Sequence, residues 1–263
     1  MKQKFILVDT NIFIQQLETG FKDLDYDLKP VKKLLNLLND NKAKLLLPEI
    51  VRLEYKRIFN EKKKELSSEF DKIKTSATIK SSKSKKEIDQ EIDKILEEKN
   101  RDQKEFNDVV EKLFSHKNRE DIPLNNEIIV ESYMYAVTEE KPYKKILVRA
   151  DEAQPLIAHT IQPDCLIIES CHYFLKNLDN YLFLISTNDK DYFNEEGSDL
   201  DSNIKKTFKT TNIYKTLAEL LNKEFNAKLP IKKEPKEKKP GQVIESSVVS
   251  SSASASKSAS QKK

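Results

Sequence analysis

The stretch Lys4-Phe-Ile-Leu-Val-Asp-Thr-Asn-Ile-Phe13 decides how this chain is expected to fold. Its apolar run from Phe5 to Val8 is typical of a strand buried on both faces of a parallel sheet. Asp9 and the two residues after it favour helix N-caps and turns, and an apolar helical pattern follows. Open α/β sheets keep their active sites at the carboxyl ends of the strands, so Asp9 is either a functional carboxylate or only a helix cap.

The length and charge of the chain allow one sizeable domain with appendages and exclude a uniformly basic protein. The 263 residues carry a formal net charge of only +3, from 47 basic and 44 acidic side chains. Any surface that attracts nucleic acid must therefore arise from local segregation of charge. The chain has only 3 glycines, which argues against a Gly-rich phosphate loop.

The cysteines and the hydropathy pattern predict a protein of the reducing cytoplasm. Cys165 and Cys171 lie on one predicted helix, where a disulfide between them is geometrically unfavourable. The histidines do not complete a zinc site at recognised spacings. No apolar run is long enough for a signal peptide or a membrane span, so no membrane partner is expected.

Strand and helix patterns alternate along the chain, which predicts an α/β fold. Strands are expected at residues 5–8, 43–47 and 181–185, with a weaker one near 207–210. Helices are expected to begin at Pro30, Pro48, Asn125 or Asn126, and Gln162, with a short one at 151–159 and a last one at 213–225. The apolar run at 146–148 remains of undecided type.

Residues 60–121 are expected to be an inserted, charged helical hairpin. Apolar residues recur every three or four positions before and after a Ser/Lys-rich link at 75–86, which indicates two antiparallel helices. The charged faces are either simply solvated or, at the Lys-rich tip, a nucleic-acid clamp. Residues 1–228 would then form one domain around this insert, and the Lys/Ser-rich residues 229–263 a disordered tail.

Four acidic residues lie at the ends of predicted elements. Asp9 ends the first strand, and Glu54 lies in the helix after the second strand. Asp164 opens the late helix, and Asp189 follows the late strand. In a parallel sheet with right-handed crossovers these positions converge at one edge. Each acid alone could be a cap, a solvated side chain or a turn residue, so the ordered set indicates the site.

That ordered set resembles the PIN-domain nucleases. The matching segments are Val8 to Phe13, Pro48 to Tyr55, Asp164 to Ile167 and Ile185 to Tyr192. In that family the first strand commonly ends in an Asp-Thr-Asn-type triplet, and the last motif commonly reads Thr-x-Asp-x-Asp followed by an aromatic residue. The resemblance covers residues 4 to about 226 apart from the charged hairpin. It implies a three-layer α/β/α fold with a central, mostly parallel sheet.

The resemblance also implies metal-dependent hydrolysis of phosphodiester bonds, usually in RNA. Asp9, Glu54, Asp164 and Asp189 would be the metal-binding acids, because carboxylate oxygens suit the hard cations Mg²⁺ and Mn²⁺. The side chains that would orient these ligands are those of Thr10 or Asn11 and Thr187. Asp191 is the reserve candidate if Asp189 points away from the ion. Whether the site holds one ion or two stays open.

We therefore expect a Mg²⁺- or Mn²⁺-dependent endoribonuclease. Lys144, Lys145 and Arg149 precede the late acidic helix and are candidates for contacts with the nucleic-acid backbone, or are plain surface charge. A non-catalytic RNA-binding or protein-interaction scaffold and a DNA nuclease of the same fold are the alternatives. A homodimer or an inhibitory protein partner is also open.

Overall fold

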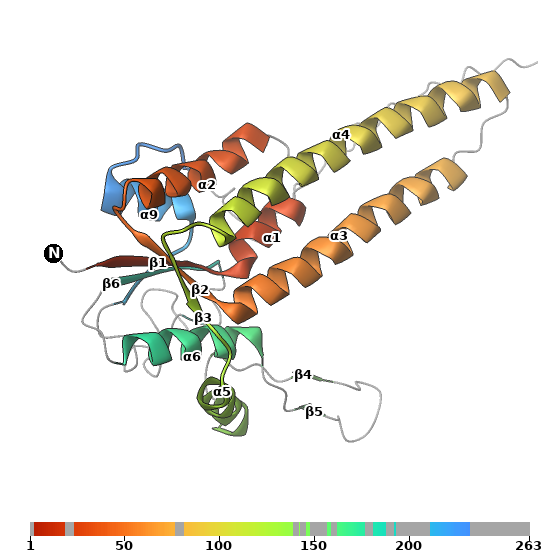
Figure 1. The fold of residues 1–263 in the computed structure, drawn as a ribbon. Coiled ribbons are helices and arrows are strands. Elements are labelled where there is room, and N and C mark those ends of the chain that lie inside the picture. Colours follow the sequence, from red (N-terminus) through yellow and green to blue (C-terminus); the bar gives the residue numbers. More distant parts are fainter. Residues whose placement is uncertain are drawn as a thin grey trace, which may run out of the picture. The chain divides into compact units, whose positions relative to one another are not determined.

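The computed structural model describes residues 3–18, 24–76, 82–138, 142, 146–147, 157–158, 162–176, 181–187, 192 and 211–231 (Figure 1). The chain divides into two units, residues 1–231 and residues 232–263, and the second lies outside the described residues. The fold and the site belong to the first unit.

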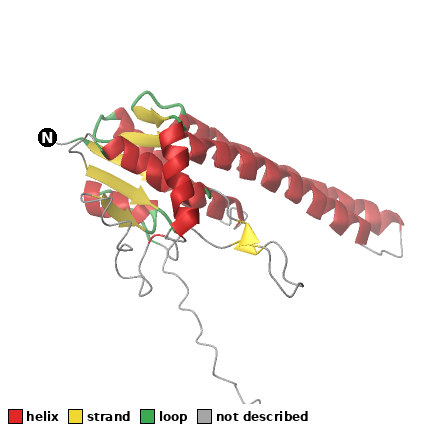
Figure 2. Cartoon of the chain, turned by 90° about the horizontal axis from the view of Figure 1, so that it is seen from below, coloured by secondary structure: helices red, strands yellow, loops and turns green. Residues whose placement is uncertain are grey.

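A parallel sheet of five strands forms the centre of this unit (Figure 2). Its order is β3 (Arg119–Ile122), β2 (Lys44–Pro48), β1 (Lys4–Val8), β6 (Tyr181–Ile185), β7 (Thr211–Tyr214). The two central strands are almost fully buried, with Leu7 and Ile185 at 0% exposure. The expected strands at the amino terminus, before Pro48 and before Ser186 are thus confirmed, because a strand covered on both faces must be continuously apolar.

Helices cover both faces of the sheet, as Figure 1 shows. One face carries α1 (Thr10–Glu18), α2 (Leu24–Asn39) and α9 (Leu217–Phe225). The other carries α5 (Asn126–Thr138) and α6 (Pro163–Leu175). This arrangement is the expected three-layer α/β/α fold with a mostly parallel sheet. None of the helices in the described ranges combines the length and hydropathy that a membrane crossing requires.

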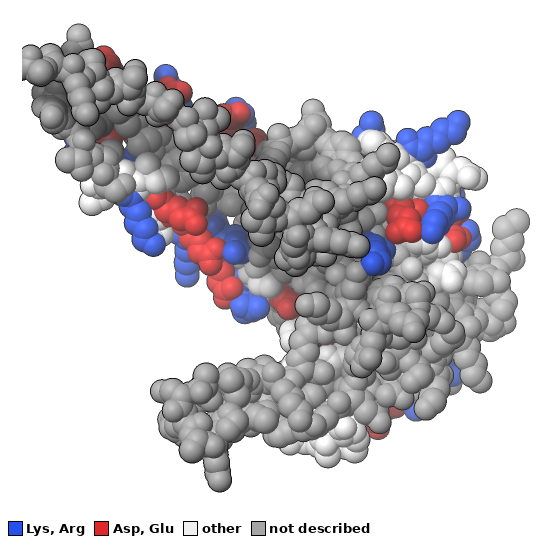
Figure 3. Space-filling model, turned by 180° about the vertical axis from the view of Figure 1, so that it is seen from behind, with Lys and Arg blue, Asp and Glu red and all other residues white. Residues whose placement is uncertain are grey.

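The helical hairpin consists of α3 (Glu49–Ser76) and α4 (Ser82–Phe114), which pack along each other and reach beyond the sheet (Figure 1). On the inner part of α4 the buried residues Phe106, Val110 and Leu113 recur at steps of four and three positions, which gives an apolar stripe there. Both signs of charge line the projecting arm (Figure 3). The hairpin is not a separate appendage, because α3 starts directly after strand β2.

Three aromatic rings join the base of this hairpin to helix α1. Phe13 of α1, Tyr55 of α3 and Phe114 of α4 contact one another edge to face, with ring centroids 5.4 to 5.8 Å apart. Tyr55 is 1% exposed, and its hydroxyl donates to Asn107 Oδ1 at 3.3 Å. Buried edge-to-face pairs stabilise a packing geometry beyond their apolar area. The first turns of α3 are therefore held against α1 and the inner end of α4.

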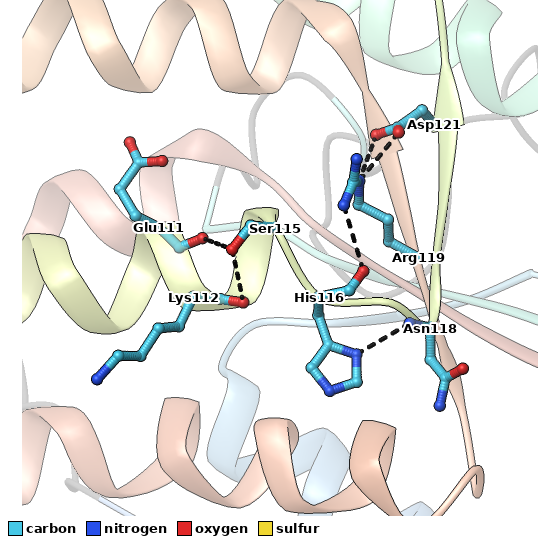
Figure 4. Close-up of polar contacts among 7 residues, drawn as sticks. All are labelled: Glu111, Lys112, Ser115, His116, Asn118, Arg119 and Asp121. Carbon is cyan, nitrogen blue, oxygen red and sulfur yellow. Dashed lines mark hydrogen bonds and ion pairs between the residues drawn. The ribbon is translucent and has the colours of Figure 1, made fainter.

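Strand β3 was not predicted from the sequence, because its residues are mostly charged. It lies at the edge of the sheet, where Glu120 and Asp121 face solvent. Figure 4 shows how the chain reaches it from α4: His116 Nδ1 accepts from the Asn118 N–H at 3.0 Å, and Arg119 Nε donates to Asp121 at 2.9 Å. Burial and the charge of Lys117 lower the pKa of His116, which fits a neutral ring that accepts at Nδ1.

Some element boundaries differ from expectation. Helix α2 begins at Leu24 and contains Pro30 in its interior, since burial of Leu28 at 0% exposure favours the earlier turn. Residues 157–158 form strand β5 (Ile157–Ala158), antiparallel to β4 (Ile146–Leu147), where a short helix was expected. The expected strand near 207–210 lies outside the described residues, and β7 follows it directly.

Candidate active site

Asp9 lies at the carboxyl end of the central strand, where β1 and β6 end side by side. Val8 is paired with Ile185, and the Asp9 backbone N–H extends the ladder by donating to the Ile185 carbonyl at 2.9 Å. Helix α1 starts at the next residue, so a strand and a helix fix the Asp9 backbone from both sides. Only 1% of Asp9 is exposed, so its carboxyl group is withdrawn from water.

The Asp9 carboxyl group accepts hydrogen bonds from two neighbours. Ser186 Oγ donates to Oδ2 at 2.5 Å. Asn11 donates its side-chain amide to Oδ2 at 3.5 Å and its backbone N–H to Oδ1 at 3.4 Å. The long backbone contact makes Asp9 a weak helix cap, whereas the short bond comes from a residue 177 positions away in the sequence. The side chain is therefore oriented mainly by the neighbouring strand.

Burial and neighbouring charges make ionisation of Asp9 unfavourable. Its pKa is raised from 3.8 to about 7, first by burial and next by the charge of Asp164, with a smaller contribution from Glu54. The hydrogen bonds from Ser186 and Asn11 oppose this rise because they favour the charged form. Among the described residues no cationic side chain lowers the pKa of Asp9. A bound metal ion would offset the energetic cost of burying a carboxylate that has no cationic partner.

Glu54 faces the same region from the second turn of α3. Its pKa is raised by burial and by the charge of Asp164, and lowered by the Thr10 hydroxyl and by Arg57. Glu54 directly precedes Tyr55, so the aromatic contacts at the base of the hairpin fix where the carboxylate lies. Glu54 and Asp164 therefore repel each other across a space between α3 and α6, two helices that are in contact.

Thr10 links the first helix to Glu54. It is 0% exposed, and its hydroxyl is close enough to the Glu54 carboxylate to lower the pKa of that group. The contact is loose, however, because Thr10 Oγ1 makes no hydrogen bond of strict geometry within the described part of the chain.

Asp164 opens helix α6 and is held by a tyrosine. Pro163 and Asp164 occupy the first turn, where a proline costs no hydrogen bond and a carboxylate interacts favourably with the helix dipole. Tyr192 is fully buried, and its hydroxyl donates to Asp164 Oδ1 at 3.0 Å. Burial and the charges of Asp9 and Asp164 raise the pKa of Tyr192, so its hydroxyl keeps its proton and acts as a donor.

The structure thus brings Asp9, Glu54 and Asp164 within mutual electrostatic reach at one edge of the sheet. Sequence reasoning assigned no role to Ser186 or Tyr192, although both lie in the quoted late motif. Thr187 is partly exposed, and its neighbour Ser186 makes the described contact with Asp9. Six of the other candidates or their neighbours lie outside the described residues: Lys144, Lys145, Arg149, Asn188, Asp189 and Asp191.

The donor set fits a hard divalent cation by its chemistry. Carboxylate oxygens are the ligands that Mg²⁺ and Mn²⁺ prefer, and the raised pKa of Asp9 marks charge that an ion would offset. In their present positions no three His, Cys, Asp or Glu side chains of the described ranges are close enough to hold an ion. Asp9, Glu54 and Asp164 are the described residues that would hold such an ion.

Comparison with known proteins places this geometry in a family. The model of the PIN domain matches residues 6–192. The chain belongs to the PIN-domain family. No curated protein and no solved structure matches it. PIN domains are generally nucleases, and the three acids that this PIN domain gathers all lie within the matched residues. The match also spans the hairpin, so α3 and α4 lie inside the PIN domain.

Proposed function

We propose that this PIN domain is a Mg²⁺- or Mn²⁺-dependent endoribonuclease that hydrolyses RNA phosphodiester bonds. Asp9, Glu54, Asp164 and Asp189 would hold the ion. One observation carries the proposal: a carboxyl group with 1% exposure and a pKa of about 7 is repelled by two further acids from different elements. Such an arrangement destabilises the protein unless a cation offsets the repulsion, which a purely structural role would not require.

The surrounding side chains support the proposal through the atoms they orient. Ser186 holds Asp9 Oδ2, and Tyr192 holds Asp164 Oδ1, so each acid presents its remaining oxygen lone pairs in a defined direction. Thr10 and Asn11 lie on the first turn of α1 beside Glu54 and Asp9. A bound ion would activate a water molecule and neutralise charge on the phosphate. The chain itself supplies the carboxylate ligands, of which Asp9 and Asp164 are oriented by hydrogen bonds.

The choice of RNA rests on the resemblance of two motifs to a family of nucleases, and the choice of the cytoplasm rests on the cysteines. The late motif and the Asp-Thr-Asn triplet are the part of the sequence that resembles nucleases acting on RNA. Cys165 and Cys171 are buried and are not joined in a disulfide, which suits a reducing compartment. A DNA nuclease would use the same carboxylate chemistry, so a direct comparison of both nucleic acids is needed.

Cleavage of a labelled single-stranded RNA, with a DNA of matching sequence, tests the proposal. The wild-type chain should cleave RNA with Mn²⁺ or Mg²⁺ present and not with EDTA. Asp9→Asn and Asp164→Asn should each lower the rate by at least about 100-fold, because removal of a metal ligand or its partner commonly costs 10- to 100-fold or more. Asp108→Asn removes an exposed acid from α4 and is the matched control.

Three results would contradict this assignment. Cleavage that survives Asp9→Asn and Asp164→Asn would show that another site, or a contaminant, carries the activity. Faster cleavage of the DNA than of the RNA would make the chain a DNA nuclease. Tight RNA binding with no cleavage and no effect of Mn²⁺ on stability would favour a non-catalytic scaffold.

A further inference from the structure

We infer that the exposed basic face of the first half of α3 binds the sugar–phosphate backbone of the nucleic acid that enters the carboxylate site. This basic ridge consists of Arg52, Lys56, Arg57, Lys63 and Lys64. The inference rests on the proposed function for the identity of its ligand. It concerns a different set of residues and a different measurement, because binding to the ridge needs no metal and no cleavage.

Charge is segregated along α3, although the hairpin as a whole carries both signs. Between Glu49 and Lys64 all five basic side chains of the ridge are exposed, and Glu61 is the one exposed acid. The outer part of the helix reverses this balance, with Glu65, Glu69 and Asp71 exposed. A simply solvated helix has no reason to separate its charges in this way. The positive half is the one that begins at the carboxylate site.

Helix geometry arranges the ridge in two rows. Arg57 and Lys64 are seven residues apart and so point in nearly the same direction, about 10 Å apart along the axis at 1.5 Å per residue. Arg52, Lys56 and Lys63 form the second row at steps of four and seven residues, about 16 Å long. Leu53, which is 51% exposed, precedes Arg57 by one turn and offers an apolar contact for a sugar or base.

Arg57 is the member of the ridge that reaches the carboxylate site. It follows Glu54 by three residues on the same helix and is exposed. Residues three apart on a helix are neighbours on its surface, so Arg57 lies one turn beyond Glu54 on α3. A phosphate held by Arg57 would lie beside Glu54, where a cation bound to the acids would also attract it.

The Arg57–Glu61 pair keeps the guanidinium extended and still available. Arg57 Nη1 donates to both Glu61 oxygens, at 2.9 and 3.0 Å. Among the described contacts Nε and Nη2 have no partner, so their N–H donors are available to a phosphate. The Arg57 and Glu61 side chains are 59% and 52% exposed, and exposed pairs of this kind exchange partners at little cost.

Binding of a fluorescein-labelled single-stranded RNA to the full chain in EDTA tests the ridge, with fluorescence anisotropy as the readout. The double variant Arg57→Gln/Lys64→Gln should raise the Kd about 10-fold. It should also lower the slope of log Kd against log salt by about 1.4, at about 0.7 per phosphate contact. The matched control Lys72→Gln/Lys94→Gln removes two exposed lysines from the outer hairpin and should stay within about twofold of wild type.

Two further measurements distinguish backbone contacts at the ridge from binding elsewhere on the chain. Glu61→Gln keeps the five basic residues and removes the competing acid, so it should tighten RNA binding about two- to threefold. A single-stranded DNA of the same sequence should show the same dependence on Arg57 and Lys64, because the ridge is inferred to contact phosphates. If the ridge variant binds this DNA as tightly as the wild type does, the inferred phosphate contacts are contradicted.

The ridge is refuted if the ridge and control variants lose equal affinity, if the ridge variant binds as wild type does, or if wild type binds neither nucleic acid. Far-UV circular dichroism of each variant confirms that it is folded. If the wild-type chain binds RNA through the ridge but never cleaves it, the proposed nuclease function is refuted and the inference about the ridge holds. Cleavage at a wild-type rate by the ridge variant, with unchanged Kd, would refute the ridge alone.

Discussion

Asp9→Asn is expected to stabilise the metal-free protein at alkaline pH while abolishing its function. Asp9 has a pKa of about 7 in the folded chain and 3.8 in the unfolded chain. A carboxyl group whose pKa is raised by folding binds its proton more tightly in the folded state. Its ionisation therefore leaves stability unaffected below pH 3.8, lowers stability progressively between pH 3.8 and about 7, and has its full destabilising effect above pH 7.

The size of this effect follows from the two pKa values. At about 1.4 kcal/mol per pKa unit, the charged carboxylate destabilises the folded state by about 4 kcal/mol above pH 7. Asparagine keeps the shape but directs an NH₂ group at one of the present donors, which costs about 1 to 3 kcal/mol. The variant should therefore be about 1 to 3 kcal/mol more stable than wild type at pH 8.5. At pH 3.5 the advantage should disappear and the sign should reverse.

Urea denaturation in EDTA at pH 3.5, 5, 7 and 8.5 measures this difference, with Asp108→Asn as the control for loss of one surface charge. The stability difference between Asp9→Asn and wild type should grow with pH up to about 7 and then stay constant. If Asp9→Asn is less stable than wild type at pH 8.5, or if the difference does not change with pH, then Asp9 is not a destabilised buried carboxylate and the electrostatic reasoning fails.

Three other predictions concern the metal ion, the hydrogen bond from Ser186 and the aromatic contacts at the base of the hairpin. Saturating Mn²⁺ at pH 8 should stabilise wild type by about 2 to 3 kcal/mol at 100 times its Kd and leave Asp9→Asn unchanged, as thermal unfolding would show. Ser186→Ala removes the short bond to Asp9 and should raise the pKa of Asp9 further, which shifts the stability profile to higher pH. Phe114→Ala should lower the free energy of unfolding by about 3 to 5 kcal/mol, because Phe114 contacts both Phe13 and Tyr55. Tyr173→Ala, at a site 43% exposed, should change it by less than about 1 kcal/mol.

Elements with strong local signals could be predicted from the sequence. Strands β1 and β6 are uninterrupted apolar runs, and α6 begins at a proline followed by an acid. Strand β3 could not be predicted, because an edge strand needs burial at few positions and its residues are charged. The start of α2 was placed six residues too late, since the proline rule ignores the burial that Leu28 gains.

The site divides in the same way. Asp9, Glu54 and Asp164 could be chosen from the sequence because each lies where a strand or a helix ends or begins. Their mutual repulsion depends on distances in space, and so it required the structure. The hydrogen bonds from Ser186 and Tyr192 join residues 177 and 28 positions apart, for which no local pattern exists.

The sequence by itself determined the apolar strands β1, β2 and β6, the helices that follow them, and the acids Asp9, Glu54 and Asp164 at or near the ends of these elements. Hydrophobic periodicity, helix caps and prolines act over a few neighbouring residues, so these signals can be recognised in the sequence alone. Only the tertiary structure decided that Asp9 is buried within electrostatic reach of Asp164 and that the Tyr192 hydroxyl donates to Asp164. The reason is physical: desolvation and Coulomb energy depend on separation in space, and strand pairing and helix packing set that separation.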